Sequence, residues 1–81
     1  MQIIYDEAKR LTNIEKHGLD FSELDIEFFD RSKVAPAKLG RWLAIGEFKG
    51  EMVIAVVFRP LGSEALSIIS MRPASRKERI L

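Results

Sequence analysis

The last ten residues of the chain carry four cations against a single acid. They follow an apolar run, and Pro73 is expected to end the strand that this run forms. Ser75-x-x-Glu78 has the capping-box pattern that starts a helix, so Glu78 is expected to complete a cap with Ser75. An arginine donates two parallel hydrogen bonds to a phosphate group. This stretch therefore favours a protein that handles nucleic acid, with Arg72 and Arg79 as phosphate ligands.

Two further side chains have the chemistry for proton transfer. His17 is the only histidine, and histidine is the residue type that titrates near neutral pH without any perturbation. It is the first candidate for a general base or acid, although an imidazolium at a helix end also has a structural use. Glu47 is a second candidate, as a base or as a carboxylate that orients an arginine. A strand carboxylate paired with a neighbouring cation is the simpler interpretation of Glu47.

The remaining arginines divide into two groups. Arg59 and Arg72 each close an apolar strand, and a hairpin through residues 60–64 would place them at opposite ends. Arg72 is therefore grouped with Arg76 and Arg79. Arg59 is expected to bind RNA, to stabilise the turn or to contact a protein partner. A solvated C-terminal helix whose cations complement its dipole is the alternative for Arg76.

Lys9 and Lys16 stand seven residues apart, so they share one face of a helix and would widen the basic surface. Taken alone, such lysines indicate only solubility. Trp42 has the ring to stack on a base, but a tryptophan in a strand is more often part of the core.

Composition sets limits on the function. The chain has 81 residues, 47% of them apolar and 31% charged, which indicates one globular domain over residues 1–81. The net charge is only +1, but residues 1–40 hold 6 cations and 8 acids (−2), and residues 41–81 hold 7 and 4 (+3). Such a chain can offer a basic face to phosphate and an acidic face elsewhere.

Several classes of protein and site are disfavoured. The chain has no cysteine and one histidine, which leaves no metal site and no thiolate chemistry, and fits a cytoplasmic location. The acidic N-terminus does not resemble a signal peptide. The longest apolar run, residues 52–58, is too short to span a bilayer. No motif for a cofactor is present.

The helical segments come first in the chain. Residues 2–5 predict a short strand, and residues 7–17 predict a helix with Gly18 after its end. Ala8, Leu11 and Ile14 follow one another at intervals of three residues, so we expect them on the buried side of this helix. A second helix is expected to begin at Ser22-x-x-Asp25, with residues 21 and 26 as a hydrophobic staple.

Three strands follow, at residues 42–48, 52–58 and 66–71, with a weaker one around residues 33–35. The order β-α-α-β-β-β with a short C-terminal helix predicts an α+β fold, in which the helices pack on one face of an antiparallel sheet.

The order and spacing of several fragments are similar to those of one family. The fragments are Tyr5-Asp6-Glu7-x-Lys9, Asn13, Lys16-His17-Gly18-x-x-Phe21, Phe28 and Phe29, Val56-Val57-Phe58-Arg59, and Ile68-Ile69-Ser70-x-Arg72-x-Ala74-x-x-x-Glu78-Arg79. Together they resemble the BrnT toxins, which are bacterial type II toxin–antitoxin ribonucleases with a RelE-like fold.

The resemblance implies an activity and partners. It implies a ribonuclease that cleaves RNA without a metal and arrests growth, with no cofactor. It also implies a cognate BrnA-type antitoxin that neutralises the toxin, and a complex that represses its own operon and reaches operator DNA only through the antitoxin. A homodimer and a toxin–antitoxin heterotetramer both stay open as assemblies. No membrane partner is expected.

Metal-free RNA cleavage needs a base for the ribose 2′-OH, an acid for the leaving oxygen and cations for the phosphate. His17, Glu47, Arg72 and Arg79 are the candidates for these catalytic roles, and Lys9, Lys16, Arg59 and Arg76 are candidates for binding RNA. The competing hypothesis is a binding module without catalysis, which would hold RNA or a protein through the same cations and leave RNA intact.

Overall fold

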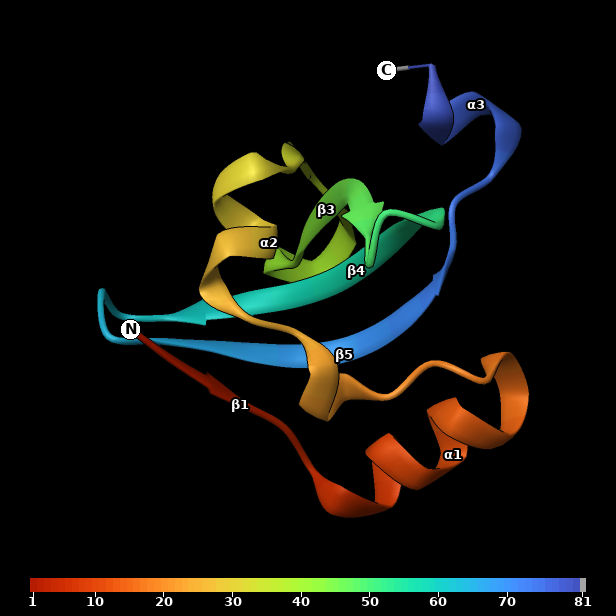
Figure 1. The fold of residues 1–81 in the computed structure, drawn as a ribbon. Coiled ribbons are helices and arrows are strands. Elements are labelled where there is room, and N and C mark those ends of the chain that lie inside the picture. The colour runs from red at the N-terminus through yellow and green to blue at the C-terminus, as the bar shows by residue number, and fades with distance from the viewer. Residues whose placement is uncertain (81) are drawn as a thin grey trace.

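A computed structural model describes residues 1–80 and forms one five-stranded sheet with helices along it (Figure 1). In chain order the elements are β1 (Gln2–Ile4), α1 (Glu7–His17), the 3₁₀ helix η1 (Phe21–Glu23), α2 (Ile26–Arg31), β2 (Lys33–Pro36), the 3₁₀ turn η2 (Lys38–Gly40), β3 (Trp42–Phe48), β4 (Met52–Leu61), β5 (Ala65–Pro73) and α3 (Arg76–Arg79).

The strand order in the sheet is β1-β5-β4-β3-β2. Strands β2 to β5 form the expected antiparallel meander, and the weaker strand candidate around residues 33–35 is β2. The sheet is mixed rather than purely antiparallel, because β1 pairs with β5 in the parallel direction. The connection from β1 to β5 contains α1, α2 and strands β2 to β4, and its length allows this pairing, since a parallel neighbour cannot be reached by a tight turn.

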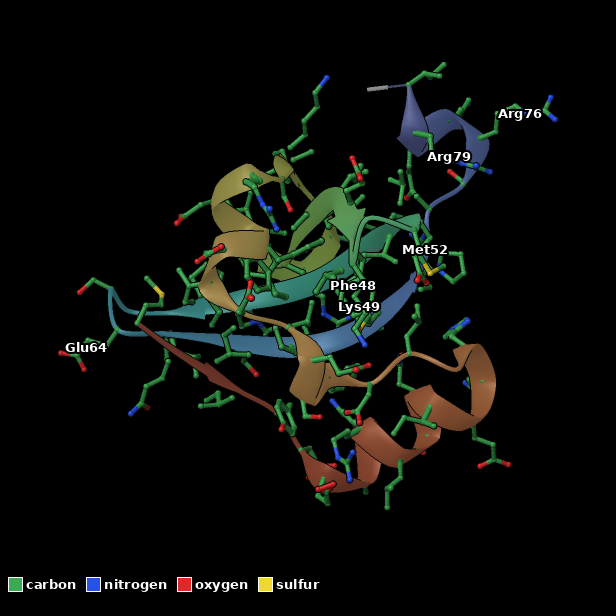
Figure 2. The ribbon with its side chains drawn as sticks, viewed as in Figure 1. Phe48, Lys49, Met52, Glu64, Arg76 and Arg79 are labelled. Atoms are coloured by element: carbon green, nitrogen blue, oxygen red, sulfur yellow. The ribbon has the colours of Figure 1, made fainter. Side chains whose placement is uncertain are left out.

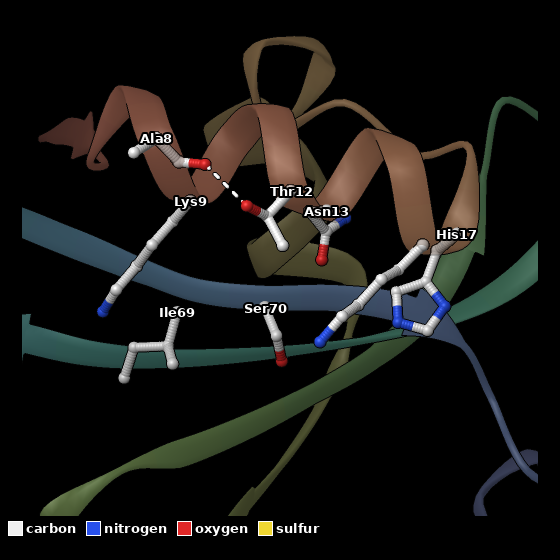
Figure 3. A pocket seen from close by; sticks show the side chains of 8 residues that line it. Ala8, Lys9, Thr12, Asn13, His17, Ile69 and Ser70 are labelled. Atoms are coloured by element: carbon white, nitrogen blue, oxygen red, sulfur yellow. Dashed lines mark hydrogen bonds between the residues drawn. The ribbon is translucent and has the colours of Figure 1, made fainter.

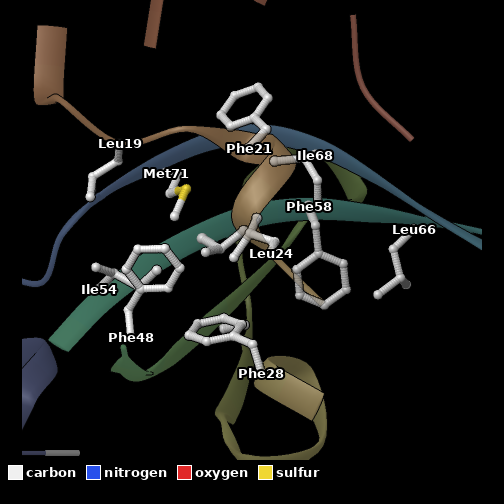
Figure 4. Close-up of a cluster of buried hydrophobic side chains, with 12 residues drawn as sticks. Leu19, Phe21, Leu24, Phe28, Phe48, Ile54, Phe58, Leu66, Ile68 and Met71 are labelled. Carbon is white, nitrogen blue, oxygen red and sulfur yellow. The ribbon is translucent and has the colours of Figure 1, made fainter. Parts of the chain in front are cut away.

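One face of the sheet carries the main hydrophobic core (Figure 4). Phe21 and Phe28, from η1 and α2, lie against Ile54, Val56 and Phe58 of β4. Because side chains alternate along a strand, these β4 residues define the helix-covered face. The phenylalanine rings bury much of the apolar area available to so short a chain. Met71 is also fully buried there, whereas Trp42 is half-exposed, unlike the core position expected for it.

The start of the second helix differs from the prediction. Asp25 caps α2 by accepting a hydrogen bond from the backbone nitrogen of Phe28 at 2.9 Å, so the helix begins at Ile26. Ser22 lies in η1, whose cap is Asp20. Phe21 is part of the core instead of a hydrophobic staple. Two short capped turns therefore replace one longer helix.

Within residues 1–80, no helix combines the length and apolar character needed to cross a bilayer.

Candidate nucleic-acid interface

The sheet face opposite the phenylalanine core, called here the open face, carries a smaller apolar cluster and several polar side chains. Ile45, Ala55 and Ala74 form its buried cluster. By strand alternation, Arg59 and Arg72 of β4 and β5 lie on this face. The open face is therefore the surface on which the strand-borne arginines are presented.

A β-bulge in β5 brings two consecutive side chains to the open face. Val57 of β4 pairs with Ser70 and Phe58 pairs with Ile68, so Ile69 is left without a partner in the register. A bulge of this kind re-aims side chains and is common beside functional sites. Ile69 and Ser70 both line a groove of about 340 Å³ between β5 and α1.

The α1 side of this groove is basic (Figure 3). Lys9, Lys16 and His17 line it, together with Thr12 and Asn13. His17 is the last residue of α1, before Gly18 in the left-handed conformation (φ 69°). His17 is exposed and lines the same groove as Ser70. The structure thus brings three of the sequence-predicted residues, the two lysines and the histidine, into one groove.

Asn13 holds α1 against β5. Its side-chain nitrogen donates to the carbonyl oxygens of Leu19 at 2.9 Å and Met71 at 2.8 Å, and its oxygen accepts from the backbone nitrogen of Met71 at 3.1 Å. The amide therefore pairs with Met71 as a neighbouring strand would, beyond the point where β1 ends. Buried backbone groups must be paired, and this contact fixes the width of the groove.

Arg72 lies two residues beyond Ser70 on the same face and forms an ion pair with Glu78. Its Nη1 donates to Oε1 at 2.7 Å and its Nη2 donates to Oε2 at 2.8 Å. Glu78 Oε1 also accepts from the backbone nitrogen of Ser75 at 2.8 Å, which completes the predicted capping box of α3. The hydrogen bonds from Arg72, followed by those from Ser75, lower the pKa of Glu78 to about 2 despite its partial burial.

The other predicted residues lie apart from the groove. Arg76 and Arg79 are exposed on α3, at the opposite end of the molecule from the β4–β5 turn that holds Glu64 (Figure 2). Arg59 pairs in register with Ser67, whereas Arg72 pairs with Ala55, so the two arginines are about 13 Å apart along β4. This confirms that they lie at different ends of the hairpin.

Glu47 occupies a separate pocket of about 400 Å³ that Arg31, Lys49 and Gly50 also line. The structure does not bring it to His17. Among the described residues, no group of three or more histidine and acidic side chains is arranged as a metal site.

Sequence reasoning gave no role to Ser70 or Asn13. A signal for Ser70 existed, because the alternation of Leu66 and Ile68 continues at Met71 instead of residue 70, and this one-residue slip marks a bulge. Asn13 belongs to the fragments that carry the family resemblance, but its role could not be inferred, since its partner lies 58 positions away.

The comparisons with known proteins agree with this geometry. The sequence profile of a family described as "Ribonuclease toxin, BrnT, of type II toxin-antitoxin system" matches residues 5–78. The chain is also similar to the crystal structure of the Brucella abortus ribonuclease toxin BrnT, with 63% identity and a TM-score of 0.89 over 94% of this chain and 99% of that one. No curated protein sequence matches closely enough to add a relative. The chain belongs to the BrnT family of ribonuclease toxins of type II toxin–antitoxin systems.

Proposed function

We propose that the chain, as a single toxin domain, is a metal-independent endoribonuclease whose substrate strand lies in the groove between α1 and β5. The observation that carries this proposal is the convergence of Lys9, Lys16 and His17 on one groove beside Ser70. The lysines would hold the phosphates of the strand by charge. His17 would take the proton of a ribose 2′-OH or give one to the leaving 5′-oxygen.

The arginines would stabilise the charge that builds on the phosphate. Arg72 is the nearest to the groove along β5, and two of its five N–H groups are used by Glu78. Nη1 also donates to the Pro73 oxygen at 3.5 Å, and the remaining N–H groups would face an anion with the guanidinium held in place. Arg79 and Arg76 would extend the basic surface onto α3. Arg79 would reach a phosphate only if the RNA strand continues beyond Arg72.

Glu47 has a weaker claim to catalysis, because it lines a different pocket from His17. If it acts, it would do so on another part of the RNA strand. A Glu47→Gln variant with full cleavage activity would remove it from the mechanism.

Neutralisation by a BrnA-type antitoxin would require the basic groove to be covered. We expect acidic or apolar antitoxin side chains over Lys9, Lys16 and Arg72, in a complex formed in the cytoplasm. The complex, as a heterotetramer or with a toxin homodimer at its centre, would repress its operon through DNA contacts made by the antitoxin. The support for a partner is the family itself, which is defined by a toxin–antitoxin system.

The test is incubation of the purified, antitoxin-free chain with labelled RNA in excess EDTA. We expect cleavage that leaves 2′,3′-cyclic phosphate ends. His17→Gln should slow it by about 10²-fold or more, the usual contribution of general acid–base catalysis, while Glu15→Gln, an exposed change on the same helix, should leave it unchanged.

Three outcomes would contradict the proposal. Cleavage that stops in EDTA and returns with Mg²⁺ would refute metal independence. A folded His17→Gln variant that cleaves at the rate of the unaltered chain would refute the role of His17. Intact RNA, both naked and on translating ribosomes, would favour the binding module without catalysis.

A further inference from the structure

A second arginine lies beside Arg59 on the open face. Trp42 of β3 pairs with Phe58 of β4. Beyond this pair, the chain continues with Arg41 on the side of β3 and with Arg59 on β4. Arg41 is extended (φ −93°, ψ 167°), and strand alternation places it on the same face as Leu43 and Ile45. The two arginines therefore occupy neighbouring positions on adjacent strands of the open face.

Arg41 contains an unpaired buried donor. Its Nε is shielded from solvent and has no hydrogen-bond partner among residues 1–80. A buried N–H without a partner is costly, and each such group in a folded protein calls for an explanation. No salt bridge joins Arg41 or Arg59 to an acid in the part of the chain that the structure describes.

The backbone holds both arginines in place. The η2 turn closes through hydrogen bonds from Arg41 N to the Lys38 oxygen at 3.2 Å and from Ala37 N to the Arg41 oxygen at 2.9 Å. Arg59 Nη2 donates to the carbonyl oxygen of Leu39 at 3.2 Å. Leu39 has a positive φ of 61°, an unusual backbone conformation for leucine, so the turn is held in a strained form that brings its carbonyl to Arg59.

Like charges side by side on neighbouring strands destabilise a sheet. An anion bound between the two arginines would remove this repulsion. The site is also continuous with the groove, because Ser70 pairs with Val57 and Arg59 lies only two residues, about 7 Å, farther along β4. The cations of α1, β4 and β5 thus line one path over the open face.

We propose that Arg41 and Arg59 form a phosphate subsite for the RNA strand, separate from the phosphate at Arg72. This inference rests on the proposed function, since it extends the same strand from the groove across β4. An acidic segment of a protein partner would satisfy the same arginines, but the continuity with the groove favours RNA. The subsite would bind a phosphate outside the scissile one and so set the length of RNA that binds well.

The test is fluorescence anisotropy with a 2′-O-methyl RNA oligonucleotide, which has no free 2′-OH to attack the phosphate and so reports binding alone. We expect Arg41→Gln and Arg59→Gln each to weaken binding by about tenfold. The slope of log Kobs against log salt concentration should flatten by about 0.7 for each lost contact. Arg31→Gln, which makes the same charge change at the end of α2, should change neither the affinity nor the slope, because it is an arginine away from the open face.

The outcomes separate the subsite from the proposed function. An unaltered chain that binds RNA, with both variants folded by circular dichroism and equal to it in affinity and slope, would overturn the subsite alone. Variants that bind RNA normally but lose affinity for the antitoxin would also overturn it and assign the arginines to the protein partner. An unaltered chain that neither binds nor cleaves RNA would overturn the proposed function, and the subsite with it. Arg59→Gln keeps the test valid if Arg41→Gln does not fold, because Arg59 is exposed.

Discussion

The ion pair between Arg72 and Glu78 should make a pH-dependent contribution to stability that one substitution removes. Hydrogen bonds from Arg72, and then from Ser75, lower the pKa of Glu78 from 4.5 to about 2. A shift of this size corresponds to at most about 3 kcal/mol of unfolding free energy. The side chain of Arg72 is 35% exposed, so solvent screening reduces the expected value to about 1–2 kcal/mol.

The sign follows from the lowered pKa. A carboxyl group whose pKa is lower in the folded state stabilises the fold fully above its unfolded pKa near 4.5. That contribution is lost as the pH falls from about 4.5 through about 2. Glu78→Gln removes the charge but keeps a side chain that can still cap Ser75 N, since glutamine also serves in capping boxes. The substitution therefore isolates the ion pair from the cap.

Urea unfolding at pH 7 and pH 3.5 measures the effect. We expect Glu78→Gln to lower the free energy of unfolding by about 1–2 kcal/mol at pH 7 and by less at pH 3.5. Glu64→Gln, an exposed change at the β4–β5 turn, should cost less than about 0.5 kcal/mol at both. A loss equal at the two pH values, or no larger than that of Glu64→Gln, would refute the reasoning. A double-mutant cycle with Arg72→Gln should give a coupling energy of similar size.

Two further substitutions test the packing that shapes the site. Asn13→Ala leaves the backbone groups of Met71 buried and unpaired. It should therefore lower the free energy of unfolding in urea titrations by about 3 kcal/mol, while Thr12→Ala should lower it far less. Equal losses in the two variants would contradict the contact between Asn13 and β5. Gly46→Ala places a Cβ 2.7 Å from Ser32 Oγ, which donates to the Phe28 oxygen. It should cost about 1–2 kcal/mol, and Ser32→Ala should relieve part of this cost in the double variant, whereas strict additivity would contradict the clash.

Local signals in the sequence predicted most of the elements. Helix α1 spans residues 7–17 and ends before Gly18 as expected, and the Ser75–Glu78 capping box forms in α3. The three strands of the meander were also recognised from their apolar runs. These features depend on residues within a few positions of one another, so they can be inferred without knowing the tertiary fold.

The predicted orientation of α1 was wrong, and the error has a physical reason. Apolar spacing predicted that Ala8, Leu11 and Ile14 face the core, but Leu11 is 55% exposed and Asn13 is the buried residue of the helix. The helix runs along the edge of β5 rather than over the middle of a sheet face. An edge contact is made through backbone groups, so its key residue is polar, and a search for apolar periodicity overlooks it.

The residue types of the candidate site could be predicted from the sequence, but which of these residues lie together in the fold could not. Arg72 was expected to bind phosphate, yet its closest partner in the fold is Glu78, six residues later, because the chain turns back after Pro73. Glu47 and His17 were both candidates for proton transfer, although the two line different pockets. Arg41 was passed over because its importance depends on a neighbour on another strand. Such relations follow from register and crossover, which local patterns do not encode.

The uneven distribution of charge along the chain becomes a difference between two sides of the sheet. The exposed acids Glu23, Asp25 and Glu27 lie on η1, at the cap of α2 and on α2, and the phenylalanines of these two elements cover one sheet face. The strand-borne arginines lie on the other face. Although the net charge is only +1, basic and acidic side chains are therefore concentrated on opposite sides of the sheet. The resulting field would draw RNA phosphates toward the open face and away from the acidic side. Orientation on encounter would then be set before any single contact forms, and added salt should slow RNA association.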